Sequence, residues 1–217
     1  MKTKEYIKNI IQRMVRLIAQ NKPTLVVIGA STGGPKAIQT ILEAMPKDIN
    51  AVFLIAQHMP PGFTGSLAER LDDICNIRVK EARFEDKLVK GTAYIAPGGY
   101  HLKVKKKNGE LYINLEEPTE KWGYTPSIDI MMQSVAEVDE NMPIIGVILT
   151  GMGSDGAKGM KKLKRKGAFT IAQDEKTSVI YGMPKMAVKL GVVDKVMDIH
   201  DIPGEIIRLV VDINGRQ

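Results

Sequence analysis

Cysteine is nearly absent from this chain of 217 residues. Cys75 is the single one, which excludes an internal disulfide and any zinc site built on several cysteines. The sequence shows no secretory signal pattern, and no apolar run is long enough to span a bilayer. We therefore expect a cytoplasmic chain that does not insert into a membrane.

Aromatic residues are also scarce, at 5% of the chain, which argues against the stacking platforms that bind single-stranded nucleic acid. Basic residues outnumber acidic ones, 31 Lys and Arg against 25 Asp and Glu, for a formal net charge of +6. This balance favours association with nucleic acid, anionic lipid or an acidic protein. Because aromatic residues are few, we do not expect nucleic acid, and most of the charges suit an ordinary solvated surface.

The chain does contain a regular alternation of strand and helix patterns. Hydrophobic residues make up 44% of it, enough for the core of one domain, and we find no internal repeat. Apolar runs predict strands and 3.6-residue spacing predicts helices. The expected strands are 25–28, 51–57, 77–79, 93–96, 143–149, 168–172 and 192–196, and the expected helices are 34–45, 63–71, 128–138, 157–165, 184–190 and 202–212. This alternation predicts an α/β fold with a doubly wound, mostly parallel sheet flanked by helices.

Three local features add to this pattern. Asn108-Gly109 lies between two alternating segments, 101–107 and 110–115, and predicts an antiparallel hairpin appended to the sheet. Ser127 is a candidate cap for the helix that follows it. Residues 5–19 form an amphipathic pattern, which is either an extra packed helix or the tail of a linker from an upstream domain.

The stretch 25–35 (LVVIGASTGGP) places a serine in a glycine-rich turn between a strand and a helix. Gly29-x-Ser31-x-Gly33 has the spacing of a nucleophile elbow. The same turn suits a phosphate cradle at a helix N-terminus, and it also suits a tight turn with no further role. A dinucleotide site is disfavoured, because the run lacks G-x-G-x-x-G and 55–60 offers no acidic residue for a ribose.

Reactive side chains follow three of the predicted strands. Ser31 follows the first, His58 the second and Asp155 the strand at 143–149. Because the carboxyl ends of parallel strands meet at one edge, we expect these side chains to meet there as nucleophile, base and orienting carboxylate. Taken singly, His58 would be a structural residue and Asp155 an N-cap for the helix at 157–165. His101 and His200 lie at no such strand end.

Several segments make the sequence recognisable. Those at 29–34 (GASTGG), 57–60 (QHMP), 126–129 (PSID) and 149–156 (LTGMGSDG) resemble the catalytic domain of the bacterial chemotaxis protein-glutamate methylesterases, the CheB family. Two later segments, 173–174 (QD) and 181–184 (YGMP), are similar to further motifs of that family. The resemblance extends over about residues 24–212, and the segment at 149–156 is its most specific part.

The resemblance implies roles for five residues. Ser31 is the nucleophile, His58 the general base and Asp155 the residue that orients the histidine. Thr32 and Met152 line the site, with the backbone N–H of Met152 near the developing oxyanion, where preorganised donors stabilise the transition state. The alternative for Met152 is a side chain that packs in the crevice wall. No metal or organic cofactor is implied.

The implied reaction is hydrolysis of glutamate γ-methyl esters on methyl-accepting chemoreceptors, through an acyl-enzyme and with release of methanol, in chemotactic adaptation. Family members also deamidate receptor glutamines. The acidic helical bundle of the receptors suits the positive charge of this chain. Lys161, Lys162, Lys164, Arg165 and Lys166 are candidates for docking on it, and a solvated helix face is the alternative. We expect the chain to act as a monomer.

The family's upstream receiver domain is missing from this sequence. By resemblance, residues 1–22 are the helical remnant of a linker and residues 23–217 the methylesterase catalytic domain. Two other functions stay open: a serine hydrolase that acts on a different ester or amide, and a regulatory module that binds a nucleotide or phosphate. In the second, Ser31 would be dispensable and His58 irrelevant. The segment at 149–156 argues against both.

Overall fold

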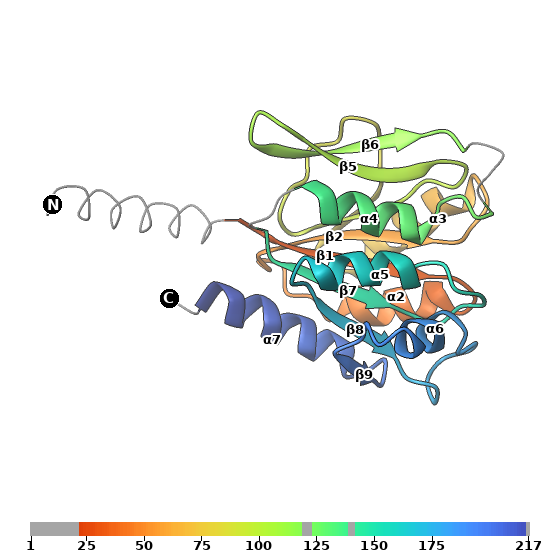
Figure 1. Cartoon of the computed structure of the whole chain (residues 1–217). Coiled ribbons are helices and arrows are strands. Elements are labelled where there is room, and N and C mark those ends of the chain that lie inside the picture. Colours follow the sequence, from red (N-terminus) through yellow and green to blue (C-terminus); the bar gives the residue numbers. More distant parts are fainter. Residues whose placement is uncertain (1–21, 119–122, 139–141, 216–217) are drawn as a thin grey trace, which may run out of the picture.

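A parallel sheet forms the centre of the molecule (Figure 1). The structure is a computed structural model, and it describes residues 22–118, 123–138 and 142–215. Within these, seven strands lie in the order β3-β4-β2-β1-β7-β8-β9, and each neighbouring pair is parallel. The strands are β1 (Thr24–Ala30), β2 (Ala51–Gln57), β3 (Arg78–Glu81), β4 (Thr92–Ile95), β7 (Ile144–Ile148), β8 (Phe169–Gln173) and β9 (Lys195–Met197). The predicted doubly wound fold is confirmed.

The central strands β1 and β2 are buried along their whole length. Strands covered on both faces need apolar side chains at every position rather than at alternate ones, which is why both segments read as continuous apolar runs. From β1 the chain adds β2 beside it, then forms the edge strand β3 and comes back to insert β4 between β3 and β2. It later adds β7 on the other side of β1. The strand order therefore reverses at β1, where open α/β sheets form their ligand crevice.

Helices cover both faces of the sheet. On one face, apolar side chains of α2, α3 and α7 pack into a cluster with the sheet. On the other face, α4, α5 and α6 pack into a second cluster, which also includes side chains of β5 and β6. The helices are α2 (Gly34–Glu43), α3 (Phe63–Ile74), α4 (Ile128–Val138), α5 (Ala157–Arg165), α6 (Met183–Lys189) and α7 (Ile202–Gly215).

The predicted hairpin is present as a separate sheet of two antiparallel strands, β5 (His101–Lys107) and β6 (Glu110–Glu116). Asn108 and Gly109 have φ of 53° and 82°, the positive values that a tight two-residue turn requires at both positions. The hairpin lies beside α4 (Figure 1), and the backbone N–H of Val104 donates to the Ser134 hydroxyl at 3.1 Å. It therefore anchors α4 from the side opposite the sheet.

Three helices begin directly at the carboxyl edge of the sheet. The residues before α2, α3 and α5 are Gly33, Gly62 and Gly156, with φ between 81° and 91°. This left-handed conformation is open to glycine without steric penalty. It lets the chain turn from a strand into a helix within a few residues, so the side chains in these turns lie close to the edge.

One predicted strand is displaced. The strand expected at 192–196 is observed as β9, Lys195–Met197. Gly191 has a φ of 66°, Val192 is buried in the cluster that includes α6, and the Asp194 carboxylate accepts the backbone N–H of Thr170 at 2.9 Å. The apolar pair that suggested a strand therefore fills the core, and pairing starts only after Asp194.

The amphipathic pattern at residues 5–19 lies outside the described residues, as do positions 119–122 between the hairpin and α4. Of the helices that the structure describes, none has the length and apolar character to cross a bilayer.

Candidate active site

The three predicted reactive residues lie on neighbouring loops at the carboxyl edge of the sheet. Ala30 pairs with Gln57 in the β1–β2 register, so Ser31 and His58 leave the sheet side by side. The backbone N–H of His58 donates to the carbonyl of Ala30 at 3.0 Å, and that of Ser31 donates to the carbonyl of Thr150 at 3.0 Å. These bonds continue the ladder past the strand ends and tie the loops after β1, β2 and β7 together.

Ser31 lies in a tight turn, and its hydroxyl makes no hydrogen bond to any residue that the structure describes. Its carbonyl accepts the N–H of Gly34 at 2.8 Å and the side-chain amide of Gln57 at 3.0 Å. On the facing loop, a Cβ added to Gly151 would lie 2.6 Å from the Cβ of Ser31, a distance that real Cβ atoms do not adopt. Glycine at position 151 therefore lets the loop after β7 pack directly against the serine.

His58 and Asp155 form a direct pair. Nε2 of His58 lies 2.8 Å from Oδ2 of Asp155, and each side chain is only 9% exposed. A carboxylate accepts the proton of Nε2, so in the neutral ring Nδ1 carries the lone pair. This Nδ1 is buried and has no hydrogen-bond partner among the residues that the structure describes. The pairing leaves one ring nitrogen without a partner on a loop that lies beside the Ser31 turn.

The Asp155 carboxylate is held at the N-terminus of α4. Its oxygens accept the backbone N–H groups of Ile128 and Asp129 at 2.8 and 2.9 Å, that of Gly156 at 3.0 Å and the Ser127 hydroxyl at 3.2 Å. Burial pulls the pKa of Asp155 upward, but the hydrogen bond to His58 and those from the backbone outweigh it, so the pKa lies below its ordinary value. Asp155 is therefore anionic at neutral pH.

This geometry contradicts the alternative role of Asp155 as the N-cap of the helix at 157–165. The N-cap of the helix that follows it is Gly156, which makes no side-chain cap hydrogen bond. The carboxylate instead caps α4, which is distant in sequence, and the positive end of that helix dipole favours its negative charge. The predicted cap by Ser127 is confirmed, since its hydroxyl accepts the N–H of Ile130 at 3.3 Å.

A buried histidine holds the residue that precedes α4, next to the bound Asp155 carboxylate. His101, at the start of β5, is 2% exposed, and its Nδ1 accepts the backbone N–H of Ser127 at 3.2 Å. Burial lowers the pKa of His101, in keeping with a neutral ring that accepts a hydrogen bond. Sequence reasoning gave His101 no role, because the contact joins residues 26 positions apart and has no sequence pattern.

Tyr124 is a second residue that sequence reasoning missed. Its ring stacks on the imidazole of His58, with ring centroids 4.3 Å apart and planes 8° from parallel. The tyrosine follows the undescribed positions 119–122, in the segment between the predicted hairpin and the helix predicted over 128–138. An aromatic residue two positions before Pro126 is the one signal the sequence offers, and it is too weak to identify a contact with His58.

Thr32 lies in the Ser31 turn itself, and Met152 lies in the loop after β7 that packs against this turn. The Thr32 carbonyl accepts the Thr150 hydroxyl at 2.9 Å, which joins the two loops. The Met152 side chain is 64% exposed, so it does not pack in a crevice wall. The backbone N–H groups of both residues have no hydrogen-bond partner within the described part of the chain.

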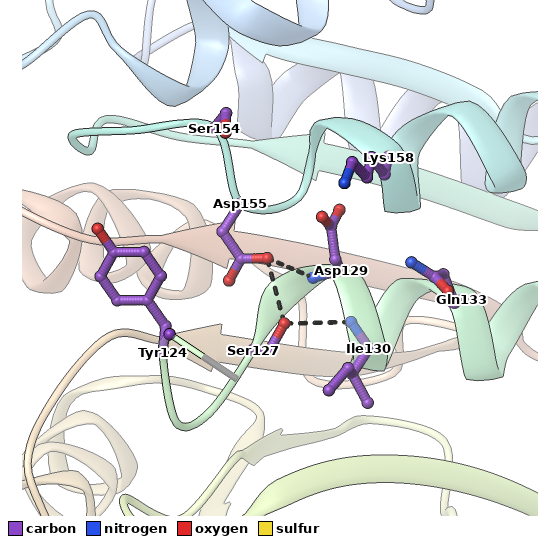
Figure 2. A pocket seen from close by; sticks show the side chains of 9 residues that line it. Tyr124, Ser127, Asp129, Ile130, Gln133, Ser154, Asp155 and Lys158 are labelled. Carbon is purple, nitrogen blue, oxygen red and sulfur yellow. Dashed lines mark hydrogen bonds between the residues drawn. The ribbon is translucent and has the colours of Figure 1, made fainter. Parts of the chain in front are cut away.

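A pocket of about 440 Å³ adjoins Asp155 between α4 and α5 (Figure 2). Among the residues that line the pocket, Figure 2 shows Asp155 hydrogen-bonded to Ser127, Tyr124 at one side and Lys158 on α5. Within it, Asp129 accepts the N–H of Gly159 at 2.6 Å, and burial raises the pKa of Asp129. A second pocket, of about 320 Å³, touches Gly33 and Thr150 on the other side of the serine turn.

The basic residues of α5 differ in their partners. Lys162 pairs with Glu137 at 2.8 Å, and Lys164 pairs with Asp194. Lys161 and Arg165 are exposed and make no ion pair with any residue in the described ranges. Those ranges also contain no group of three His, Cys, Asp or Glu side chains placed to hold a metal ion.

A parallel α/β sheet with Ser, His and Asp on adjacent loops of its carboxyl edge has the architecture of a serine hydrolase. The family model described as CheB methylesterase matches residues 26–206. The chain therefore belongs to the CheB methylesterase family.

Individual relatives agree with this assignment. A protein-glutamate methylesterase/protein-glutamine glutaminase from Pyrococcus horikoshii is 46% identical over 88% of this chain and 51% of its own length. A similarly named protein from Nitratidesulfovibrio vulgaris is 49% identical over 84% of this chain and 49% of its own length. The chain thus spans about half the length of the curated relatives it matches.

A solved structure shares the fold. The crystal structure of the Thermotoga maritima CheB methylesterase catalytic domain matches with a TM-score of 0.83 and 42% sequence identity, over 86% of this chain and 98% of that one.

Proposed function

We propose that this chain hydrolyses glutamate γ-methyl esters on chemoreceptors by a Ser-His-Asp mechanism in the cytoplasm. One observation carries the proposal. Nε2 of His58 lies 2.8 Å from the fixed Asp155 carboxylate, and Nδ1 is buried without a hydrogen-bond partner among the described residues. Ser31, on the neighbouring loop, has a hydroxyl that likewise makes no hydrogen bond within the described ranges. A serine becomes a strong nucleophile when a positioned base takes its proton. The names of the relatives support glutamate methyl ester and glutamine as the substrates.

In the first half of the reaction, Oγ of Ser31 attacks the ester carbonyl and its proton passes to Nδ1 of His58. Asp155 stabilises the imidazolium that forms. The tetrahedral intermediate then collapses: the bond to the methoxy oxygen breaks, the imidazolium returns its proton to that oxygen, and methanol leaves. In the second half, water adds to the acyl-enzyme, its proton passes to His58 and then to Oγ of Ser31, and free glutamate is released. A glutamine follows the same course with ammonia as the leaving group.

The negative oxygen of the tetrahedral intermediate needs preorganised donors. We assign this role to the backbone N–H groups of Thr32 and Met152. Both are without a partner inside the described ranges, and the residue after a nucleophilic serine commonly supplies one such donor.

The deciding experiment is methanol release from methylated chemoreceptor membranes. The parent chain should release methanol, Ser31→Ala should release none above background, and Ser66→Ala, an exposed serine on α3, should match the parent. If all three folded proteins leave the methyl groups in place, methylesterase activity is not a property of this chain, and nucleotide binding would be tested next.

The receptor is proposed to dock partly on α5. Since Lys162 and Lys164 already have acidic partners, Lys161 and Arg165 are the better candidates of the basic group. Reversing both charges should reduce receptor demethylation several-fold at low salt and leave hydrolysis of a small ester unchanged, because surface attraction is screened by salt. The double reversal of the distant residues Lys47 and Lys90 is the matched control. Equal loss on both substrates would contradict docking.

Two further proposals concern the rest of the protein. We propose that residues 1–22 are the end of a linker from a receiver domain and that residues 23–217 are the catalytic domain. The lengths of the relatives, about twice the matched region, support a larger whole protein. We also propose that the catalytic domain acts as a monomer.

A further inference from the structure

We propose that Tyr124 is a positioning residue that holds the imidazole of His58 in its reactive plane. This inference rests on the proposed function, because it assigns a role toward the same histidine. It goes beyond the triad, since Tyr124 belongs to the segment that enters α4 and not to any of the three reactive loops.

A single hydrogen bond does not fix a ring. The contact between Nε2 of His58 and Asp155 holds one atom of the imidazole, and the ring plane remains free to turn about that point. The parallel stack, with centroids 4.3 Å apart, restrains the plane as a whole. With the plane restrained, Nδ1 keeps one fixed direction, which the proposed proton transfer from Ser31 requires.

Tyr124 also covers the site from solvent. Its side chain is 46% exposed, whereas the side chain of His58 beneath it is only 9% exposed. The hydroxyl of Tyr124 lies 3.6 Å from the position of a Cβ added to Gly153. The side chain therefore extends from the segment before α4 to the loop after β7. The tyrosine thus forms an outer lining over the imidazole and keeps water from Nδ1.

The stack has a further consequence in the transition state. When His58 takes the serine proton, it becomes a cation that lies against the face of an aromatic ring. The electron-rich face of tyrosine attracts such a cation, and the attraction is larger where water is excluded. The contact is therefore stronger with the imidazolium than with the neutral ring, which is the requirement for lowering a barrier.

The test measures the reactivity of Ser31 without a receptor. A fluorophosphonate probe forms a bond from phosphorus to Oγ of Ser31 and loses fluoride, while the serine proton goes to His58. Replacing the ring by an aliphatic side chain of similar bulk, Tyr124→Leu, should slow labelling on the order of 5- to 30-fold. Tyr124→Phe, which retains the ring, should restore labelling to within about twofold of the parent. Phe84→Leu, at an aromatic residue that is 59% exposed elsewhere, is the matched control.

Two further readouts separate positioning from a merely structural role. By NMR, the ring protons of His58 should move downfield in Tyr124→Leu and not in Tyr124→Phe, because the shielding face of the aromatic ring is lost only in the first. On methylated receptor membranes, Tyr124→Leu should lower kcat and leave KM within about twofold. Thermal unfolding of each variant checks that the chain is folded.

The outcomes are distinct. Labelling of Tyr124→Leu at the parent rate would overturn the proposal, as would equal slowing by Leu and Phe, or an effect confined to KM for the receptor. The proposed function fails separately, if the parent is not labelled at Ser31 or if His58→Gln labels as fast as the parent. Slowing by Leu alone, together with the NMR change, would establish the positioning role.

Discussion

The loops after β7 and after β1 lie side by side at the same sheet edge, yet their reactive side chains differ sharply in the number of hydrogen bonds they make. The carboxylate of Asp155 accepts five hydrogen bonds, from Ser127, Ile128, Asp129, Gly156 and His58. The hydroxyl of Ser31 has no hydrogen-bond partner in the part of the chain that the structure describes.

The difference reflects what each group has to do. A buried charge requires several donors to be tolerated, and these donors also fix its position. A nucleophile has to keep its hydrogen-bonding capacity for the substrate and the base, so partners within the protein would compete with the reaction. The site therefore combines a fixed carboxylate with a hydroxyl that is positioned only through its backbone.

Converting the fixed carboxylate to an amide should have the largest effect. In Asp155→Asn, the backbone N–H groups of Asp129 and Gly156 hold the side-chain oxygen at the Oδ1 position. The NH2 group then takes the Oδ2 position, where it faces Nε2 of His58 and the N–H of Ile128. The ring then has to accept at Nε2 and carry its proton on Nδ1, the wrong tautomer. We expect kcat to fall on the order of 10³- to 10⁴-fold. Turnover of Asp73→Asn, an exposed aspartate on α3, is the control, and a loss below tenfold would contradict the assigned tautomer.

The second largest effect is expected from a substitution in the loop after β7 that crowds Ser31. In Gly151→Ala, the new methyl group would lie 2.6 Å from the Cβ of Ser31 and 2.4 Å from the sulfur of Met183. We expect kcat to fall by about 100-fold, because a small displacement of a nucleophile has a large effect. The free energy of unfolding should fall by about 1–3 kcal/mol. Gly204→Ala, where no atom lies within 4 Å, should show neither effect in kinetics or in urea unfolding.

Removing one of the five donors should have a smaller effect. Ser127→Ala loses the bond to Asp155 and the cap on Ile130, while four donors to the carboxylate stay in place. We expect a loss of about 1 kcal/mol in stability and of about fivefold in kcat. The measurement is a double-mutant cycle with Asp155→Asn. If the two effects on kcat simply multiply, Ser127 does not act through Asp155.

The smallest expected effect is a pH dependence of stability through His101. Its pKa is lowered by burial, while a histidine in the unfolded chain titrates near about 6.5. Stability from the neutral ring is complete above that pH. It is lost as the pH falls from there toward the folded pKa, because the unfolded chain takes up the proton first. Urea unfolding at pH 7.5 and pH 5.5 should show a fall that is smaller in His101→Asn. An equal fall in both proteins would exclude His101 as its source.

Much of this site was predictable because it lies at strand ends. The strands that precede Ser31, His58 and Asp155 read as apolar runs with glycine as their main interruption, and parallel strands necessarily place their carboxyl ends at one edge. The hairpin was predictable for a similar local reason, since Asn108-Gly109 specifies its own turn. The position of β9 was not predictable, because an apolar pair such as Val192-Val193 is equally suited to an edge strand and to a loop that packs into the core.

The sequence by itself determined the alternation of strands and helices, the turns at which glycine is required and the three loops that carry reactive groups, because each depends on neighbours within a few residues. Only the tertiary structure decided which nitrogen of His58 is free, that the N-terminus of α4 receives the Asp155 carboxylate, and that Tyr124 covers the imidazole. These contacts join residues from 26 to 97 positions apart. They depend on the direction of side chains after packing, and no local spacing encodes that direction.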